Sequence, residues 1–432
     1  MKHVTPRHIS RTIALSLTAV LALSACTPGS GSKEGSVDSI KVLSRWASGT
    51  AEAEFQRQVV DKFTQESGID VEVVDGLETI DDQYETAIAA GQEPDVVIVN
   101  LFDKTLGWLD AGAIKPADEY LKEWGLAEKI DDAALTEWRQ GQKPDGQLQG
   151  IPYSGFSWPV WYNTKLLKDA GVSEIPKTTD ELIAAARKLR DKGIAPMIVG
   201  GNDWSGQKLF YQITQSYLTS DATKKIMSDG GYCSSPEMMK GIELFTKLRD
   251  GGVFVDNVQG FTADNMNNTY YSQKAAMMPA GSWAFTGAVE AGTGVVENTT
   301  LGGFPVPKDG TASAPTAFKG YTGVGFMISN KGAEEGRIEA VRKFVEAFYA
   351  DESVGGFVNT ANNVTPVNGD YASYAKNPLL TQALALDGKV GEVVLPDVWI
   401  GSSSDPITQV TALAYGNADA QTICSGLDNA TK

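Results

Sequence analysis

The chain contains the stretch Lys274-Ala-Ala-Met-Met-Pro-Ala-Gly-Ser-Trp-Ala-Phe285, in which an apolar run is followed by a turn that carries a tryptophan. Residues 275–278 suit a buried strand, Pro279 ends strand pairing, and Gly281-Ser282 suit the start and N-cap of a helix. Trp283 then lies in the first helical turn. An indole there either covers a core or offers a flat surface to a ligand, and the spacing alone leaves both interpretations open.

Upstream of this stretch, the N-terminus has the pattern of a secretory signal. Three basic residues precede an apolar run from Ile13 to Leu23, which is too short to span about 30 Å of hydrocarbon. We therefore expect residues 1–25 to be a signal peptide that is absent from the mature protein. No later segment of the sequence is apolar enough to cross a bilayer.

The signal ends in Leu-Ser-Ala-Cys26, which resembles a bacterial lipobox, whose cysteine becomes the lipidated first residue. The alternative is an ordinary signal peptide with a chance cysteine. Residues 26–36 are rich in glycine and serine and have nothing to bury, so we expect a flexible lipidated tether. The predicted product is a body attached to a membrane surface by its N-terminal lipid anchor only.

Charge and composition exclude several function classes. The formal net charge is −17, which disfavours nucleic acid and anionic lipid as partners. Both histidines, His3 and His8, lie in the predicted signal. A mature chain without histidine has no Ser-His-Asp or Cys-His nucleophilic site and no histidine-ligated zinc. About 400 residues remain after the signal, enough for two large lobes rather than one core.

Two cysteines remain beyond Cys26, namely Cys233 and Cys424. No CxxC spacing suggests metal binding or redox chemistry, so in an oxidising compartment we predict one disulfide between them. The alternative is two unpaired thiols.

The first half of the mature chain has an α/β pattern. A β-rich run at residues 40–44 is followed by helical spacing of Phe55, Val59 and Phe63, and residues 95–99 form a continuous apolar run. Such alternation predicts a doubly wound α/β sheet, whose ligands bind beyond the carboxyl ends of the strands.

A second α/β series follows the polar, Gly/Pro-containing segment 141–146. Thr178-Thr-Asp-Glu181 has the pattern of a capping box at the start of a helix, and Ser235-Pro236 predicts the start of another. Residues 302–307 suit a crossing strand, and residues 324–329 suit a later strand.

Short motifs distributed over the mature chain resemble those of the extracellular sugar-binding proteins of ABC importers, the maltose-binding-like class. In chain order they are Pro94-Asp-Val, Gly150-Ile-Pro, Tyr162-Asn163, Pro176-Lys-Thr-Thr-Asp-Glu181, Gly200-Gly201, Lys274-Ala-Ala-Met and Gly281-Ser-Trp283. The resemblance implies a two-lobed, class II periplasmic-binding-protein-like fold, in which each lobe is a doubly wound sheet and crossing segments form a hinge. Residues 37–145 plus 305–350 would form lobe 1, and residues 146–304 plus 351–432 would form lobe 2.

The resemblance also implies a function. Such a protein is not an enzyme and needs no cofactor or metal. It captures an oligosaccharide between its lobes and delivers it to the permease subunits of an ABC transporter, as a monomer at the outer face of the bacterial cytoplasmic membrane. The hinge would lie near residues 142–149, 302–307 and 347–354.

Aromatic faces suit the C–H side of a sugar ring, and planar polar groups suit its hydroxyls. Carried over by the resemblance, Trp283 is a stacking platform, Asp203-Trp204 a contact from the second lobe, and Trp399 an aromatic wall. Further candidates of these residue types are Trp46, Trp158, Phe156, Tyr153, Tyr321, Asn100, Asp103, Ser282 and Lys319. Residues 154–158 contain no carboxylate where maltose-binding protein has an acidic residue, which argues against maltose.

Two other classes fit parts of the sequence. A secreted glycoside hydrolase could use two of the many carboxylates, but the resemblance leaves no role for a catalytic pair. A ferric-ion-binding protein could use Tyr270-Tyr271, because phenolates suit hard iron. Adjacent tyrosines at this place fit better as the end of a helix packed under the strand at residues 275–278.

The lipobox predicts that Cys26→Ala leaves the protein either soluble or still carrying its signal, because lipid attachment supplies the chains needed for stable anchoring. Fractionation of cells and mass determination of the N-terminus measure both outcomes. Membrane retention of correctly cleaved Cys26→Ala protein would contradict the lipobox interpretation.

Overall fold

The computed structural model describes residues 37–76, 79–386 and 388–431. The predicted signal (1–25), Cys26 and the tether (26–36) lie outside these ranges, so those assignments stay predictions. Within the described ranges, no helix combines the length and the apolar character needed to cross a bilayer.

The described part of the chain contains two mixed α/β layers, each built on its own sheet, as predicted for the fold class. The first sheet has the strand order β11-β10-β3-β1-β2, with β4 and β5 also paired to β10. Its strands are β1 (Ser39–Ser44), β2 (Asp70–Asp75), β3 (Val96–Val99), β4 (Ile114–Lys115), β5 (Ile151–Trp158), β10 (Thr316–Ser329) and β11 (Gly391–Glu392).

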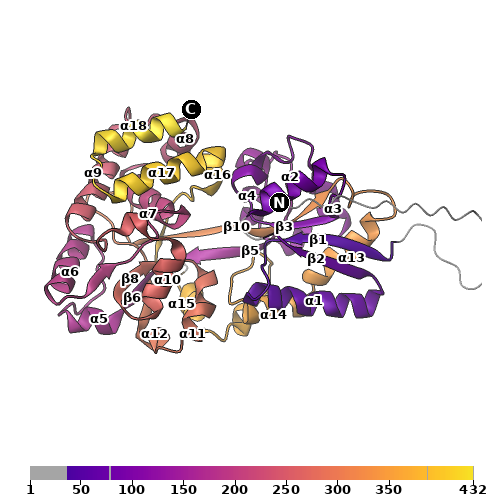
Figure 1. The fold of residues 1–432 in the computed structure, drawn as a ribbon, viewed down its shortest axis with the longest axis horizontal. Coiled ribbons are helices and arrows are strands. Elements are labelled where there is room, and N and C mark those ends of the chain that lie inside the picture. The colour runs from indigo at the N-terminus through magenta and orange to yellow at the C-terminus, as the bar shows by residue number, and fades with distance from the viewer. Residues whose placement is uncertain (1–36, 77–78, 387, 432) are drawn as a thin grey trace, which may run out of the picture. The chain divides into compact units, whose positions relative to one another are not determined.

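The centre of this sheet follows the pattern predicted from the sequence. β1 pairs in parallel with β2 and β3, and all four residues of β3 are buried. Figure 1 shows α2 (Ile80–Ala89) on one side of these strands and α1 (Ala51–Ser67) with α14 (Asp351–Thr360) on the other. Helices therefore cover both faces, which explains the continuous apolar runs in the strands.

The start, the buried face and the end of helix α1 all follow from its local sequence. The Thr50 side chain accepts a hydrogen bond from the backbone N–H of Ala53, and Phe55, Val59 and Phe63 are buried on one face. Gly68 ends the helix at a φ of 71°, a left-handed conformation that favours glycine. α1 packs against α14 and α13 (Ile338–Phe348).

The second sheet has the strand order β7-β8-β6-β9. Its strands are β6 (Val160–Asn163), β7 (Ala195–Met197), β8 (Ala275–Pro279) and β9 (Thr299–Gly302). The predicted capping box forms at the start of α6 (Thr179–Asp191), where Thr178 and Glu181 satisfy each other's backbone N–H groups. β8 is fully buried and extends through Pro279, its last residue.

The remaining described elements connect and cover the two sheets. The α-helices are α3 (Asp118–Glu123), α4 (Asp132–Glu137), α5 (Thr164–Asp169), α7 (Trp204–Thr214), α8 (Ser220–Asp229), α9 (Pro236–Asp250), α10 (Ala263–Tyr271), α11 (Phe285–Glu290), α12 (Val295–Asn298), α15 (Pro378–Leu384), α16 (Asp397–Ile400), α17 (Ser404–Tyr415) and α18 (Ala420–Ala430). The 3-10 helices are η2 (Asp103–Gly107), η3 (Ala127–Lys129), η4 (Gln140–Gln142), η5 (Gln215–Tyr217), η6 (Val258–Gly260), η7 (Ser282–Ala284), η8 (Ala372–Tyr374) and η9 (Gly401–Ser403).

Two long strands connect the sheets. β5 pairs antiparallel with β10 and leads through Pro159 directly into β6 of the second sheet, while β10 also pairs with β3 of the first sheet. Figure 1 shows both strands passing between the two groups of elements. The prediction that residues 302–307 form a crossing strand was wrong: residues 299–302 form β9, an edge of the second sheet, and the crossing is made by residues 316–329.

The β5–β10 pairing is irregular at its middle. The register shifts between Gly320 and Val324 and again between Val324 and Gly325. Such an irregularity frees backbone groups from the ladder and re-aims side chains. Residues 321–323 therefore contact groups outside the sheet, as described below.

The C-terminal helices α17 and α18 pack on α7 and α9, so the end of the chain closes the helical layer of the second sheet. Helix α14, by contrast, packs on α1 beside the first sheet. The predicted lobe boundary between residues 350 and 351 stays a prediction, and the α1–α14 contact is the observation that bears on its exact place.

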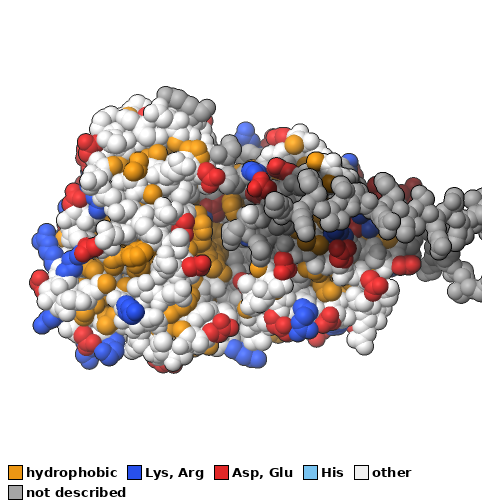
Figure 2. Space-filling view, viewed as in Figure 1, with side chains coloured by type: hydrophobic (Ala, Val, Ile, Leu, Met, Phe, Trp, Pro, Cys, Tyr) orange, Lys and Arg blue, Asp and Glu red, His pale blue; other side chains and the backbone are white. Residues whose placement is uncertain are grey.

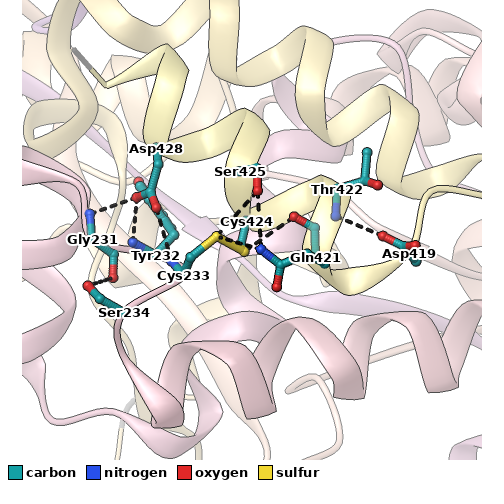
Figure 3. Close-up of a disulfide and its surroundings, with 10 residues drawn as sticks. All are labelled: Gly231, Tyr232, Cys233, Ser234, Asp419, Gln421, Thr422, Cys424, Ser425 and Asp428. Carbon is teal, nitrogen blue, oxygen red and sulfur yellow. Dashed lines mark hydrogen bonds between the residues drawn. A yellow bond between two sulfur atoms is a disulfide. The ribbon is translucent and has the colours of Figure 1, made fainter.

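A disulfide joins the turn before α9 to helix α18. Cys233 and Cys424 are bonded, with their Cα atoms 5.0 Å apart. Figure 3 shows the Asp428 carboxylate beside this bridge, where it accepts hydrogen bonds from the backbone N–H groups of Gly231 (2.7 Å), Tyr232 (2.6 Å) and Cys233 (3.2 Å). The covalent bond and the capped turn together hold the last helix against α9.

Candidate functional site

Four of the aromatic side chains predicted to bind a ligand lie together. The ring centroid of Trp283 is 5.5 Å from those of Phe156 and Trp158 and 5.8 Å from that of Trp204. Trp158 and Trp204 are 5.4 Å apart and meet edge to face at 84°. We call Phe156, Trp158, Trp204 and Trp283 the four-ring cluster. Aromatic pairs at these separations attract one another beyond simple area burial.

Strand β5 supplies two of the four rings. Residues two apart on a strand point to the same face, so Phe156 and Trp158 lie side by side. Both are buried, and with Phe318 and Leu395 they form a small apolar group separate from the main core. This group is the floor against which the other two indoles pack.

The turn after β8 supplies Trp283, which is half-buried against the apolar group. Its indole folds back over Gly281, where a Cβ atom would lie only 2.3 Å from two ring carbons, so this glycine leaves the space that the ring occupies. The prediction that Ser282 is an N-cap was wrong: Gly281 holds that position. The buried Ser282 hydroxyl instead donates to Asn363 Oδ1 (2.5 Å) and accepts from the Ser157 N–H (3.4 Å).

Trp204 is the first residue of α7 and the most exposed member of the cluster, at 39%. The preceding Asp203 was predicted to contact a ligand, but its carboxylate caps the helix. Oδ1 accepts from the N–H and the hydroxyl of Ser205 (2.9 and 2.7 Å), and Oδ2 accepts from the Ala263 N–H (2.5 Å). Both oxygens are therefore used in fixing the loop that carries Trp204.

A buried lysine lies under the rings, and our sequence analysis missed it. Lys208 is 6% exposed, and its Nζ is 5.6 Å from the Phe156 ring centroid and 5.7 Å from that of Trp158. It forms an ion pair with Asp397 of α16. The available signal was spacing: Lys208 follows Trp204 by one helical turn and so shares its face.

Asp397 extends the polar contacts to the irregular part of β10. Its Oδ2 accepts a hydrogen bond from Thr322 Oγ1 at 3.3 Å. The next residue back along β10, Tyr321, donates its backbone N–H to Glu137 Oε2 of α4 at 2.6 Å. Charged groups from α7, α16 and α4 are thus connected through residues 321–322.

The half-buried Glu137 has an unusual pKa. Burial, the largest cause, raises the pKa of this carboxyl from 4.5 to about 7, and the negative charges of Asp397 and Asp131 raise it too, although the hydrogen bond from Tyr321 opposes them. Sequence reasoning had no signal for Glu137, because it lies at the end of an ordinary amphipathic helix.

Two buried polar atoms in this region have no hydrogen-bond partner: Trp158 Nε1, a donor, and Asn100 Oδ1, an acceptor. The Asn100 side-chain N–H donates to the backbone oxygen of Gly323 in the irregular part of β10. A buried polar atom without a partner costs roughly 1–3 kcal/mol. Both atoms therefore lack the hydrogen bond that would offset the cost of their burial.

Trp46 and Tyr153 lie elsewhere, which corrects our expectation that they line the site. Trp46 is 5% exposed and packs against Phe55, Tyr153, Phe348 and Phe357, with centroids 5.9–6.2 Å apart. Tyr153 is fully buried in the same group, and burial raises its pKa well above the ordinary value. These rings fill the space between α1, α13 and α14, so hydrophobic packing accounts for them.

The other predicted residues have mixed outcomes. Lys319 is exposed and alternates with Phe318, so it lies on the opposite face of β10 from the four-ring cluster, and its contact with a ligand stays a prediction. Trp399 is half-buried outside the cluster, with Lys224 Nζ 5.2 Å from its ring centroid. Tyr321 is half-buried and contacts the site through its backbone. The side chain of Asp103 lies outside the described part of the structure.

Two surface hollows were found away from these residues. One, of about 740 Å³, is lined by residues of the α9 end and of 251–259, with Arg190 and Tyr415, and a second, of about 240 Å³, lies between Thr179 and Asp309. Figure 2 shows acidic and basic side chains interspersed on the visible face, with hydrophobic side chains gathered over the group of helices that includes α7 and α17.

The described residues contain no group of three or more His, Cys, Asp or Glu side chains placed to hold a metal ion. The two adjacent tyrosines considered for iron are both engaged: the Tyr271 hydroxyl donates to the Ala284 oxygen (2.7 Å), and Tyr270 shares a hydrogen bond with Thr299 (3.0 Å). They pack with Trp161 under the second sheet.

Two sheets connected by crossing strands, with aromatic rings and buried charges gathered beside the crossing, define a two-lobed ligand-binding protein of class II. A family model described as bacterial extracellular solute-binding protein matches residues 46–354. The chain therefore belongs to this family.

Among solved structures, the chain resembles a probable secreted solute-binding lipoprotein from Streptomyces coelicolor, with 36% identity, a TM-score of 0.80 and coverage of 91% of this chain and 98% of that one. A chitin oligosaccharide binding protein shares the fold at 23% identity and a TM-score of 0.78, covering 92% of this chain and 98% of that one. A probable sugar-binding periplasmic protein of Rhizobium meliloti (strain 1021) is 30% identical over 62% of this chain. That match spans 63% of the relative's own length.

The pKa of Glu137 predicts a pH-dependent stability. Because the folded carboxyl has a pKa of about 7 and an ordinary one has 4.5, the folded state holds its proton more tightly, and the free energy of unfolding falls as pH rises through this window. Glu137→Gln keeps an acceptor for the Tyr321 N–H but cannot titrate. In this variant, the decrease in the free energy of unfolding between low and high pH should be smaller by up to about 3 kcal/mol. Urea unfolding without ligand at about pH 5 and about pH 8 measures it. Equal pH dependence in both proteins would contradict the prediction.

Proposed function

We propose that this protein is the substrate-binding component of an ABC transporter and that it captures an oligosaccharide beside the four-ring cluster. The observation that carries the proposal is the meeting of Phe156, Trp158, Trp204 and Trp283 next to the crossing strands. The family match and the sugar-binding relative support it.

The chemistry of the cluster suits a saccharide. The C–H face of a pyranose packs on aromatic rings, and its hydroxyls need polar partners close by. Trp204 and Trp283 retain exposed surface, while Phe156 and Trp158 are buried and pack against them. Several aromatic rings in one place fit a ligand of more than one sugar unit. The protein would bind this ligand without converting it.

Delivery to permease subunits would depend on closure. We propose that the lobes, residues 37–145 plus 305–350 and residues 146–304 plus 351–432, rotate together around the sugar. The β5–β10 pairing, with its register shift at residues 320–324, is the connection that must bend or twist. The protein would act as a monomer held at the outer face of the bacterial cytoplasmic membrane by lipid on Cys26.

A thermal-shift panel of neutral saccharides tests the function. The panel would contain glucose, galactose, cellobiose, maltotriose, raffinose and chitotetraose. A ligand present at about 100 times its Kd stabilises the folded state by roughly 2.7 kcal/mol, which shifts the melting temperature measurably. An absence of any shift across the panel would contradict a saccharide-binding function.

Substitution of Trp283 tests the site. If its indole stacks on the sugar, Trp283→Ala should weaken binding by on the order of 2–4 kcal/mol, or roughly 30- to 1,000-fold in Kd. Trp283→Phe should retain more affinity, because a smaller ring still stacks. Calorimetry with the tightest saccharide of the panel measures Kd, and unfolding without sugar measures stability.

The matched control is Trp124→Ala. Trp124 is buried and stacks on Tyr120, outside the four-ring cluster, so its loss should cost stability by about 3–5 kcal/mol and leave Kd unchanged in the folded fraction. Wild-type affinity in Trp283→Ala would remove the residue from the site and with it the main reason for placing the ligand there.

A further inference from the structure

Three charged groups are connected to the four-ring cluster. Lys208 lies near the Phe156 and Trp158 rings and pairs with Asp397, and Asp397 is linked to Glu137 through residues 321–322 of β10. Lys208 supplies one ammonium, and Asp397 and Glu137 supply two carboxylates. The Lys208 side chain is 8% exposed and that of Asp397 is 13% exposed, so their attraction acts in a poorly solvated place. The set of three is therefore acidic whenever Glu137 is ionised.

Lys208 is already paired within the protein, so its ammonium group is not available to bind an anionic ligand. Lys208 is held by Asp397, and Asp397 is held in turn by Thr322. A ligand anion that drew Lys208 away would leave Asp397 buried without its partner, which is strongly unfavourable. The other charges that act on Glu137, those of Asp397 and Asp131, are negative as well.

Two buried atoms near the site lack a hydrogen-bond partner, and they need partners of opposite kinds. Trp158 Nε1 needs an acceptor and Asn100 Oδ1 needs a donor. A hydroxyl group can act as both, whereas an ionised carboxylate only accepts, and a fully ionised phosphate ester likewise offers only acceptors. The donor belongs to Trp158 of β5, and the acceptor belongs to Asn100, which directly follows β3.

Resting on the proposed function, we propose that Glu137 and Asp397 determine specificity by charge. The site admits an uncharged, hydroxyl-rich saccharide and rejects the same saccharide when it carries a carboxylate. Glu137 is the discriminating residue, because its charge is not matched within the set, and Asp397 fixes Lys208 so that it cannot compensate.

The test compares each neutral saccharide with its C6-carboxylate form, and Glu137→Gln separates the effect of charge from the loss of the C6 hydroxyl. Wild-type protein is titrated by calorimetry with glucose, galactose, cellobiose and maltotriose and with their C6-oxidised forms, which carry a carboxylate in place of one primary alcohol. At about pH 8, where Glu137 is mostly ionised, the anionic member of each bound pair should bind at least about tenfold more weakly than the neutral one.

Glu137→Gln then isolates the charge. The variant removes one negative charge but keeps an oxygen for the Tyr321 N–H. The quantity that tests the proposal is the ratio of the anionic Kd to the neutral Kd, whatever the change in the neutral Kd. The anionic-to-neutral Kd ratio should fall by about tenfold. The matched control Glu174→Gln removes an exposed carboxylate in the loop before α6 and should leave the ratio unchanged. Circular dichroism confirms that each variant is folded.

The outcomes separate the two proposals. Anionic members that bind as tightly as neutral ones, or a ratio that Glu137→Gln leaves unchanged, would overturn the charge-based specificity while the saccharide-binding function stands. Failure of every neutral and anionic member to bind would contradict both. A purely structural role of Glu137 would change stability or both Kd values together, and not their ratio.

Discussion

The antiparallel pairing of β5 with β10 is the interaction on which the rest of the structure depends. β10 belongs to the first sheet through β3, and β5 runs directly into β6 of the second, so one ladder connects both layers. The ladder breaks register at residues 320–324, which releases backbone groups of Tyr321 and Gly323 to bind Glu137 and Asn100. The same irregularity that connects the layers therefore supplies the polar side of the site.

The site combines features that are each unfavourable alone. A buried lysine would lose its charge if it were unpaired, and a carboxylate beside other carboxylates resists ionisation. Here Lys208 is paired with Asp397 and lies near the Phe156 and Trp158 rings, whose faces attract cations. Glu137 accepts from a backbone N–H but keeps a raised pKa of about 7. Such residual imbalance is common at places that bind or transform ligands.

Aromatic residues of the same type have two different roles in this chain. Trp46 and Tyr153 pack with phenylalanines of α1, α13 and α14. Trp158 and Phe156 lie a few residues further along the same strand but beside Lys208 and the two half-exposed indoles. The two groups of rings differ in the side chains that other parts of the chain place next to them. In the four-ring cluster, Trp204 is partly exposed, and Gly281 has no side chain that would clash with the Trp283 ring.

The sequence by itself determined the features that depend on near neighbours and on composition. The Thr50 and Thr178 caps, the left-handed Gly68, the buried strand β3 and the α/β class all follow from residues within a few positions of one another, and the motif order indicated the family. It also singled out the four aromatic residues that meet in the cluster. Only the tertiary structure showed that they meet, that Asp203 is a cap, that Lys319 points away, and that Lys208, Asp397 and Glu137 gather beside them. The physical reason is distance along the chain: burial, ion pairing and pKa depend on groups contributed by α4, α7, β10 and α16, whose approach no local pattern encodes.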